Sequence, residues 1–296
     1  MPPFKNLGPS DWPREQERLS YAAMRLAAMA SMSLLGSLLT GCCAHRFDRP
    51  AGPLPTATAA LDAIAARRTA MTSFEFDTRL QFFGDGKRLK GKVGLLGRRP
   101  PAGDGAQLRF EALTPSDDTL ALLITDGARF SSHERGALDC LTGEACPRNL
   151  ARLLPIDLYP DALYDALTGT PLTVTDGASL SWDDCEGTLR IDGVRPSGQS
   201  GSGTLERVTL LLSPVDYAAI RTEIRRGDEV VLTLAYSDHA ATMPGSPALP
   251  RMIRVTGAEA ELEIDIREVF LGETVGDELF VPNCPAGTTA RELPCQ

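Results

Sequence analysis

Side chains that usually carry catalysis or bind metals are few and widely spaced in this sequence. Only three histidines occur, His45, His133 and His239. Glu134 follows His133, but the second histidine that a zinc-peptidase helix needs is missing. The acidic run at residues 183–186 lacks the alternating oxygen ligands of a calcium loop and favours a solvated turn. No Gly-x-Ser-x-Gly motif, P-loop or dinucleotide fingerprint occurs either. We therefore predict no catalytic residue, no metal site, no cofactor and no enzymatic activity.

The stretch from Met24 to Cys42 carries the clearest signal near the N-terminus. One arginine precedes an uncharged, mostly apolar run that ends in Leu39-Thr40-Gly41-Cys42. The run is too short to span a bilayer comfortably and ends in small residues, as signal peptides do. It resembles a bacterial lipoprotein signal with its lipobox; an ordinary membrane anchor or a buried helix is the alternative. The resemblance implies a signal peptide over residues 1–41, export, and acyl chains such as palmitate on Cys42. Residues 1–23 fit a signal peptide badly, so we expect the true start at Met24.

Export would place the remaining cysteines in an oxidising compartment, where disulfides persist. The chain has seven cysteines, and two local pairs are expected to close short loops, Cys140–Cys146 and Cys284–Cys295. Each short loop would contribute about 2–3 kcal/mol. Cys185 then has no obvious mate except Cys43. A zinc site is the competing interpretation, but these spacings are not those of zinc fingers and no histidine lies nearby in the sequence.

The composition is that of an ordinary folded protein. Hydrophobic residues make up 43% and charged residues 23% of the 296 positions, which argues against wholesale disorder. The 30 basic and 39 acidic residues give a net charge of −9, and no block of lysine and arginine stands out. We therefore expect no nucleic-acid partner and no patch for anionic membranes. No break in composition or internal repeat indicates a second large domain.

The mature chain begins with a proline-rich tether and then becomes mainly β. Residues 42–56 form the expected tether, and alanine content and helical spacing predict a helix over Ala57–Thr72. Apolar residues then alternate with polar ones, which is typical of strands with one wet and one dry face. Asp126-Gly127 and Gly227-Asp228 are hairpin turn signals. The expected strands are Phe74–Phe82, Lys87–Leu96, Gln107–Leu113, Thr119–Thr125, Ala128–His133, Ser179–Asp183, Thr188–Ile191, Leu205–Leu212, Ile220–Arg225, Val230–Tyr236 and Glu259–Phe270.

These elements predict a single antiparallel sheet of about ten strands, curled around its apolar face. The N-terminal helix and two short central helices, Asn149–Leu154 and Pro160–Leu167, are the available covers. Pro160 stands at a typical helix start and Gly169 at a typical helix end. Leu154, Leu163 and Leu167 are the expected lid residues. The apolar face has two interpretations, a lipid-accepting cavity or a filled core, and its members are Phe74, Phe76, Leu80, Phe82, Leu108, Phe110, Leu122, Ile220, Ile224, Leu232, Leu234, Leu262 and Ile264.

The order of these elements resembles the LolA/LolB-like outer-membrane lipoproteins. The motifs behind the resemblance are Phe110-Glu111-Ala112-Leu113-Thr114-Pro115, Thr125-Asp126-Gly127-Ala128-Arg129-Phe130, Leu154-Pro155-Ile156-Asp157-Leu158 ahead of Ala166-Leu167-Thr168-Gly169, and Leu249-Pro250-Arg251-Met252-Ile253. The resemblance implies a half-open antiparallel β-barrel over residues 57–275, with helices as a lid on an apolar cavity. Residues 276–296 would form a tail without regular secondary structure that is held by disulfides of its cysteines.

The resemblance also implies a function. The chain would be a monomer, lipid-anchored at the periplasmic face of the outer membrane, that binds acyl chains or lipoproteins during their transport. One departure concerns the turn Ser116-Asp117-Asp118, which is polar where the LolB branch carries an exposed leucine that engages the membrane. The alternative function is a structural or envelope-assembly lipoprotein with a filled barrel.

Overall fold

The computed structural model describes residues 43, 45–84, 86–100, 105–152, 154, 156–175, 177–197, 205–242, 246–257 and 260–295. The predicted signal peptide over 1–41 and the predicted lipidation site Cys42 lie outside the described residues. The chain divides after Arg46, and the fold described below is that of Phe47–Gln296. None of the helices in the described ranges combines the length and apolar character that crossing a membrane requires.

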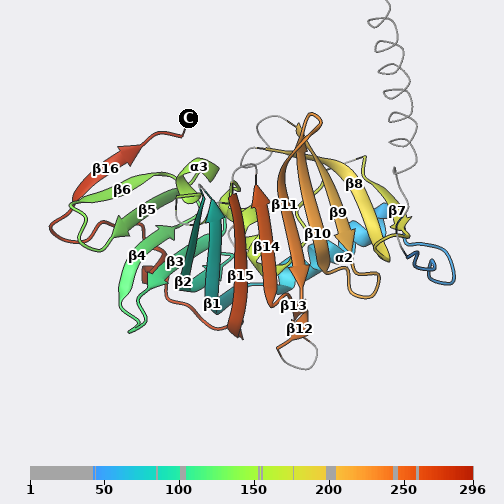
Figure 1. Ribbon diagram of the computed structural model, residues 1–296, viewed down its shortest axis with the longest axis horizontal. Helices are drawn as coiled ribbons and strands as arrows, with labels where there is room; N and C mark the ends of the chain where they lie inside the picture. The colour runs from blue at the N-terminus through green and yellow to red at the C-terminus, as the bar shows by residue number, and fades with distance from the viewer. Residues whose placement is uncertain are drawn as a thin grey trace, which may run out of the picture. The chain divides into compact units, whose positions relative to one another are not determined.

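One large sheet dominates the fold (Figure 1). Its fourteen strands follow the order β16-β6-β5-β4-β3-β2-β1-β15-β14-β11-β10-β9-β8-β7. All neighbours are antiparallel except β16 and β6, which are parallel. The strands are β1 (Ser73–Gly84), β2 (Lys87–Arg98), β3 (Gln107–Leu113), β4 (Thr119–Thr125), β5 (Arg129–Glu134), β6 (Asp139–Glu144), β7 (Ser179–Asp183), β8 (Thr188–Pro196), β9 (Leu205–Leu212), β10 (Ala219–Arg226), β11 (Glu229–Ser237), β14 (Met252–Gly257), β15 (Ala260–Leu271) and β16 (Thr289–Leu293).

The mainly antiparallel β fold is confirmed, but the predicted number of strands is wrong. With the short ladder of β12 (Ala240–Ala241) and β13 (Ala248–Leu249), the described residues form sixteen strands rather than about ten. Within the described residues the sheet also stays open, since β16 and β7 are its two edges and do not pair with each other. The predicted half-open barrel therefore corresponds to a curved sheet whose two edge strands do not pair.

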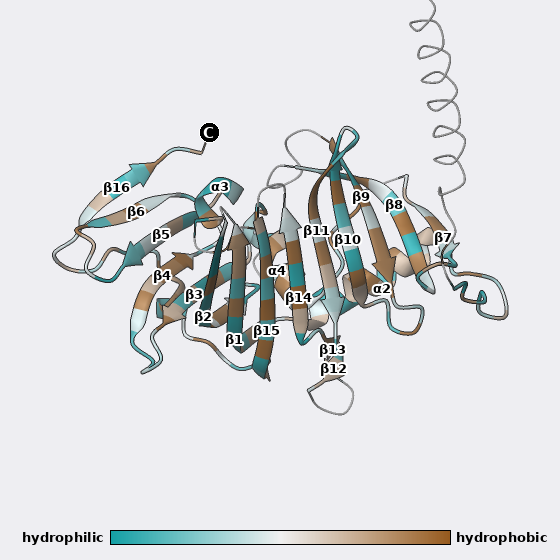
Figure 2. Cartoon of the chain, in the orientation of Figure 1, coloured by the Kyte–Doolittle hydropathy of each residue, from teal (hydrophilic) through white to brown (hydrophobic). Residues whose placement is uncertain are grey.

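Alternation along the strands produces the dry face of this sheet. In β1, Phe74 and Phe76 are buried while Glu75 and Arg79 are exposed. The same period-two pattern appears as brown and teal bands along β15 in Figure 2. Because neighbouring strands pair in register, these side chains form one continuous apolar surface.

Two of the three predicted covering helices lie over that surface. The helix α2 (Ala57–Ala70) is capped by Thr56, whose Oγ1 accepts a hydrogen bond from the Ala59 amide at 3.1 Å. The helix α4 (Pro160–Thr168) is buried over most of its length, and its Tyr164 ring lies 5.1 Å from that of Phe74. Figure 1 shows both helices behind the sheet. The third helix, α3 (Pro147–Leu150), is shorter than the predicted Asn149–Leu154.

A buried carboxylate ties these helices together. Asp165 of α4 accepts hydrogen bonds from Arg68 Nε at 2.9 Å and from Arg99 Nη2 at 3.0 Å. Its side chain is only 4% exposed. Burial raises the pKa of Asp165, while the two guanidinium groups act in the opposite direction. One side chain of α4 therefore holds both the end of α2 and the segment after β2.

The segment before α2 is held at the turn between β7 and β8. The Phe47 amide donates a hydrogen bond to the Asp184 carbonyl at 2.7 Å, and the Phe47 carbonyl accepts one from Trp182 Nε1 at 3.3 Å. The Phe47 ring also lies against Gly187, where an added Cβ would be 2.8 Å from the ring. Part of the predicted tether therefore packs on the sheet.

The predicted disulfide pairing is wrong, although the cysteines are the expected ones. The bonds are Cys140–Cys284 and Cys146–Cys295, with Cα–Cα distances of 5.7 and 6.0 Å. Cys140 lies in the extended strand β6, in which each residue advances by about 3.3 Å. The chain from Cys140 to Cys146 therefore separates these Cα atoms by far more than a disulfide allows. The tail was also expected to be irregular, yet it contains the 3₁₀ helix η2 (Asp277–Phe280) and the strand β16, which pairs with β6.

Candidate functional site

The apolar face of the sheet continues beyond the helices that cover it. In β1 the buried residues Phe74 and Phe76 are followed on the same face by Leu80 and Phe82, which are only half-buried. In β2, which pairs with β1, the buried Val93 is preceded on that face by Gly91 and then by Leu89. The side chains of these strands thus change from core to open surface towards the hairpin between them.

A difference in strand length opens a cavity at this end. The pairing of β2 with β3 stops at Lys92 and Leu113, so residues 87–91 of β2 extend beyond β3 while they remain paired with β1. The resulting open cavity has a volume of about 690 Å³, within the range of about 300–1,000 Å³ that is typical of small-molecule sites. Its lining residues are Leu80, Phe82, Leu89, Lys90, Gly91, Lys92, Val93, Ala112, Leu113, Pro115, Leu120, Ala151, Arg152 and Leu262.

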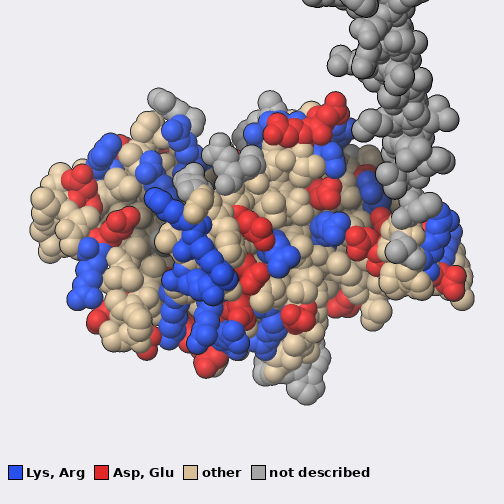
Figure 3. Space-filling view, in the orientation of Figure 1, with Lys and Arg blue, Asp and Glu red and all other residues tan. Residues whose placement is uncertain are grey.

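The chemistry of the lining fits an apolar chain. Among the described lining residues, the charged ones are Lys90, Lys92 and Arg152, and no carboxylate, histidine, serine or cysteine is present. Two leucines of the lining, Leu89 and Leu120, are 59% and 44% exposed. Figure 3 shows lysine and arginine side chains gathered over β1 and β2 on the face of the sheet opposite its covering helices. The site can exclude water from hydrocarbon, at about 0.8 kcal/mol for each methylene group.

The predicted lining residues divide into three groups. Leu80, Phe82 and Leu262 line the cavity. Leu122 and Ile220 are half-buried. The others are buried in the core: Phe74, Phe76, Leu108, Phe110, Ile224, Leu232, Leu234 and Ile264. The expected lid residues, Leu154, Leu163 and Leu167, are also core residues.

The sequence missed several lining residues for two reasons. Gly91, Ala112 and Ala151 are too small to stand out in a hydrophobic pattern, although they leave the space that larger neighbours enclose. In β4 the run of apolar residues hides the phase of the strand, and a register shift against β3 at Ala112 puts Leu123 on the buried face instead of Leu122. Leu89, by contrast, follows the alternation of β2 and could have been predicted.

The polar turn Ser116-Asp117-Asp118 lies beside the cavity, next to the lining residue Pro115. The Thr114 hydroxyl accepts a hydrogen bond from the Asp118 amide at 3.0 Å. Asp117 adopts a left-handed conformation with φ of 65° and accepts a hydrogen bond from Lys92 Nζ at 2.8 Å. This hydrogen bond, together with nearby carboxylates, raises the pKa of Lys92. The turn is therefore fixed to β2 by charge.

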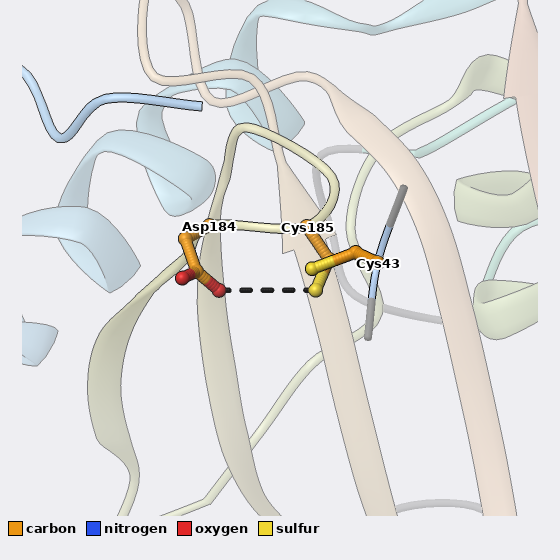
Figure 4. A group of neighbouring side chains, drawn as sticks. All are labelled: Cys43, Asp184 and Cys185. Atoms are coloured by element: carbon orange, nitrogen blue, oxygen red, sulfur yellow. Dashed lines mark hydrogen bonds between the residues drawn. The ribbon is translucent and has the colours of Figure 1, made fainter. Parts of the chain in front are cut away.

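The acidic run at residues 183–186 forms a structured turn, as the sequence favours. Asp183 Oδ1 accepts hydrogen bonds from the amides of Cys185 and Glu186 at 3.1 and 3.0 Å. Figure 4 shows Asp184 and Cys185 at this turn, with Cys185 Sγ 3.8 Å from Asp184 Oδ1. Cys185 is disulfide-bonded, so it does not offer the thiolate that a metal would require.

A second hollow of about 690 Å³ lies on the β8–β9–β10 part of the sheet. Its lining is mostly charged, and its charges are paired: Arg190 with Asp192 at 2.6 Å, and Arg207 with Asp228 at 2.8 Å. It offers no apolar wall of the kind found at the first cavity. The cavity between β1, β2 and β4 is therefore the better candidate.

Comparison with known proteins identifies the fold. No family model matches the sequence, and no curated protein matches it. Among solved structures, a DUF1329 family protein from Desulfovibrio piger matches with a TM-score of 0.56 and 12% identity, over 77% of this chain and 98% of that one. A LolA superfamily protein from Nitrosomonas europaea matches with a TM-score of 0.49 and 12% identity, over 77% and 98%.

At a TM-score of 0.56, the likeness to the DUF1329 family protein shows the fold of this chain. The architecture expected from the LolA/LolB resemblance is present in the chain itself. A helix, a set of hairpins, short central helices and a second set of hairpins follow one another and form one curved sheet.

Proposed function

We propose that this chain is a lipid-binding envelope protein that holds an acyl chain, either of a free lipid or of a lipoprotein, in the cavity between β1, β2 and β4. The observation that carries the proposal is the uncovered apolar face of β1 and β2, which forms a cavity of about 690 Å³ with Leu80, Phe82 and Leu262 in its lining. Hydrocarbon buried there would need few polar contacts, because each methylene contributes about 0.8 kcal/mol.

The remaining parts of the proposal come from the sequence. The lipobox-like segment that ends at Cys42 supports export and a lipid anchor. The LolA/LolB resemblance supports a LolB-like carrier that acts as a monomer at the periplasmic face of the outer membrane. The polar turn at Ser116-Asp117-Asp118 distinguishes this chain from that branch, so its contact with membrane would use other residues.

Gly91 offers a direct test of the cavity. A Cβ built on Gly91 meets no atom within 4 Å, and Gly91 lies on the apolar face opposite Leu80. In the variant Gly91→Phe the ring would occupy space that an acyl chain needs. Loss of two buried methylenes would weaken binding about tenfold. Titration with a fluorescent fatty acid measures this change, and native mass spectrometry of protein purified from the envelope would show fewer bound acyl species.

Gly94→Phe is the matched control. Gly94 lies in the same strand on the opposite face, and its Cβ position is equally open. This variant should bind the fatty acid like the wild type. Equal binding by Gly91→Phe would contradict the proposed cavity. Aspartate at Leu234 or Ile264 would be a poorer test, because both are 0% exposed and a buried carboxylate would unfold the chain.

A structural role in envelope assembly is the second candidate. Most of the predicted lining residues pack in the core, as a filled scaffold requires. A wild-type protein that carries no acyl species and binds no fatty acid would favour this role.

A further inference from the structure

Basic side chains gather on the face of the sheet opposite the covering helices. In β1, Arg79 stands next to the cavity-lining Leu80, so alternation places the Arg79 side chain on the outer face. In β2, Arg88 and Lys90 flank Leu89, and their side chains likewise lie on the outer face. Figure 3 shows the resulting blue area over β1 and β2. We call Arg79, Arg88 and Lys90 the basic patch.

Contacts across the two strands confirm this placement. The Arg88 guanidinium lies over the Phe83 ring, 5.0 Å from its centre, and donates a hydrogen bond to Gln81 Oε1 at 2.6 Å. The register places Lys90 directly opposite Gln81. Arg79 is two positions before Gln81 on the same face, about 7 Å along the strand. The three cations therefore share one small area of two neighbouring strands.

The basic patch has no counter-ions in the part of the chain that the structure describes. None of its three members forms an ion pair with a described residue. The nearby carboxylates of β15 have partners of their own, which are Arg267 for Asp265 and Arg254 for Glu261 and Glu263. Because the whole chain has a net charge of −9, the patch is a local concentration of the opposite sign. Its members come from two strands, so the sequence predicts no such patch.

Exposed leucines lie on the other face, at the same edge of the sheet. This edge is free because residues 87–91 of β2 extend beyond β3. Leu89 in this segment is 59% exposed, and Leu120, which also lines the cavity, is 44% exposed. Arg88, Leu89 and Lys90 follow one another in the strand. A surface that approaches the free edge therefore meets a leucine on one face of β2 and cations on the other.

We infer that this edge docks on an anionic phospholipid bilayer, with Leu89 and Leu120 among the acyl chains and the basic patch at the phosphate groups. An exposed leucine gains free energy when hydrocarbon covers it, and the negative potential of an anionic bilayer attracts lysine and arginine. An acidic protein segment matches the cations alone, whereas a bilayer matches both the cations and the leucines.

This inference rests on the proposed envelope location and adds the surface that meets the membrane. The cavity lies on the leucine side of the same edge. With the edge docked, the cavity opens at the bilayer, and an acyl chain enters it with little exposure to water.

Vesicle binding tests the inference. The parent protein is the expected mature chain, residues 42–296, exported with Cys42→Ser so that no acyl anchor forms; it contains the whole fold of Phe47–Gln296. Flotation measures its binding to vesicles of phosphatidylcholine, or of equal parts phosphatidylcholine and phosphatidylglycerol. We expect binding to the anionic vesicles to be at least about tenfold tighter, an effect that salt reduces because the patch is exposed.

The variant Arg79→Gln/Arg88→Gln/Lys90→Gln should lose the preference for anionic vesicles. All three positions are exposed, so the variant should fold, which circular dichroism checks. The control removes the same charge from the second hollow and should keep the preference; its substitutions are Arg190→Gln, Arg207→Gln and Arg225→Gln.

The leucines are tested by Leu89→Gln, which should weaken binding to both kinds of vesicle about fivefold. Leu205→Gln is the matched control, because Leu205 is 68% exposed at the start of β9. This control should bind vesicles like the parent protein.

Equal binding of the two kinds of vesicle by the parent protein would overturn the inference, and so would a triple variant that still prefers anionic vesicles. An unchanged affinity in Leu89→Gln would overturn it as well, because the patch would then fit an acidic protein instead. The fatty-acid titration tests the cavity separately. Fatty-acid binding without vesicle binding would overturn the docking surface and leave the proposed function standing, whereas the reverse result would contradict the proposed function and support the docking surface.

Discussion

At the scale of single residues, the absence of a side chain decides how α4 ends. Gly169 has φ of 63°, a left-handed conformation that is typical of a helix C-terminus. A Cβ added there would lie 2.6 Å from Cδ and 2.8 Å from Cγ of Pro250. The Gly169 carbonyl accepts a hydrogen bond from the Ala219 amide at 3.3 Å. The end of α4 is therefore packed between Pro250, which precedes β14, and the first residue of β10.

The variant Gly169→Ala should be destabilised for two separable reasons. The left-handed conformation costs a non-glycine residue about 1–2 kcal/mol, and overpacking against Pro250 adds about 1–3 kcal/mol. Gly86→Ala is the control, because Gly86 has φ of 69° and open space around its Cβ position, so it should lose about 1–2 kcal/mol. Urea denaturation measures both losses. If the two variants lost equal stability, the contact with Pro250 would have no energetic weight.

At the scale of elements, a carboxylate and two arginines join parts of the chain that no sheet pairing connects. Asp165 holds Arg68 of α2 and Arg99 after β2, and Arg68 Nη2 also donates a hydrogen bond to the Pro171 carbonyl at 2.7 Å. The Arg99 guanidinium lies over the Tyr164 ring, 4.6 Å from its centre. The packing of α2 and α4 over the apolar face thus depends on the buried Asp165 carboxylate and its two arginine partners.

The variant Asp165→Asn keeps the shape of the side chain and removes its charge. Arg68, which is only 21% exposed, would lose its counter-ion, and Arg99, which is exposed to the same extent, would keep Asp161, whose Oδ1 lies 3.9 Å from Arg99 Nε. Breaking such a buried pair costs about 3–5 kcal/mol, and urea denaturation measures the loss. Asp62→Asn, at an exposed position of α2, is the control and should change stability by less than about 0.5 kcal/mol. A similar small change at Asp165 would show that its charge adds nothing to the cover.

The elements that the sequence predicts well are those with a strong local pattern. The strands over Gln107–Leu113, Thr119–Thr125 and Leu205–Leu212 match the structure at both ends, because alternation and turn residues act within the segment itself. The strand β6, by contrast, contains Asp139, Thr142 and Glu144 and shows no apolar alternation. It is a strand because β5 pairs with one of its edges and β16 with the other, which no local pattern encodes.

The same reasoning explains what could be predicted of the cavity. The apolar face of β1 follows from alternation, so Leu80 and Phe82 were identified. The end of the covered part of that face depends on the length of β3 relative to β2 and on the place where α4 packs. Both depend on contacts between segments that are remote in sequence. The dry face was therefore predictable, and the boundary between core and cavity was not.

At the scale of the whole molecule, pairings between the two ends of the chain organise the sheet. The strand β15 pairs with β1 along nearly its full length and joins the two sets of hairpins. Beyond β15, the tail crosses to the far edge, where β16 pairs with β6 and two disulfides fix it. Without β16, β6 would be an edge strand, so this pairing protects β6 from pairing with other chains.

The two disulfides should contribute to stability in a strongly non-additive way. Each joins residues far apart in sequence, with separations of 144 and 149. While one bond is intact, the other closes only the short loop made of residues 140–146 and 284–295, which is worth about 3 kcal/mol. Removing the last bond also releases the long loop, which is worth about 5 kcal/mol.

Either pair of substitutions, Cys140→Ala/Cys284→Ala or Cys146→Ala/Cys295→Ala, should therefore lower the free energy of unfolding by about 3 kcal/mol. The variant with all four substitutions should lose about 8 kcal/mol, more than the two pairs together, and could be unfolded without denaturant since domains have about 5–15 kcal/mol in total. Guanidinium denaturation of the three variants measures these losses. Losses that add up would contradict the shared loop, because they would mean that each disulfide constrains the unfolded chain independently of the other.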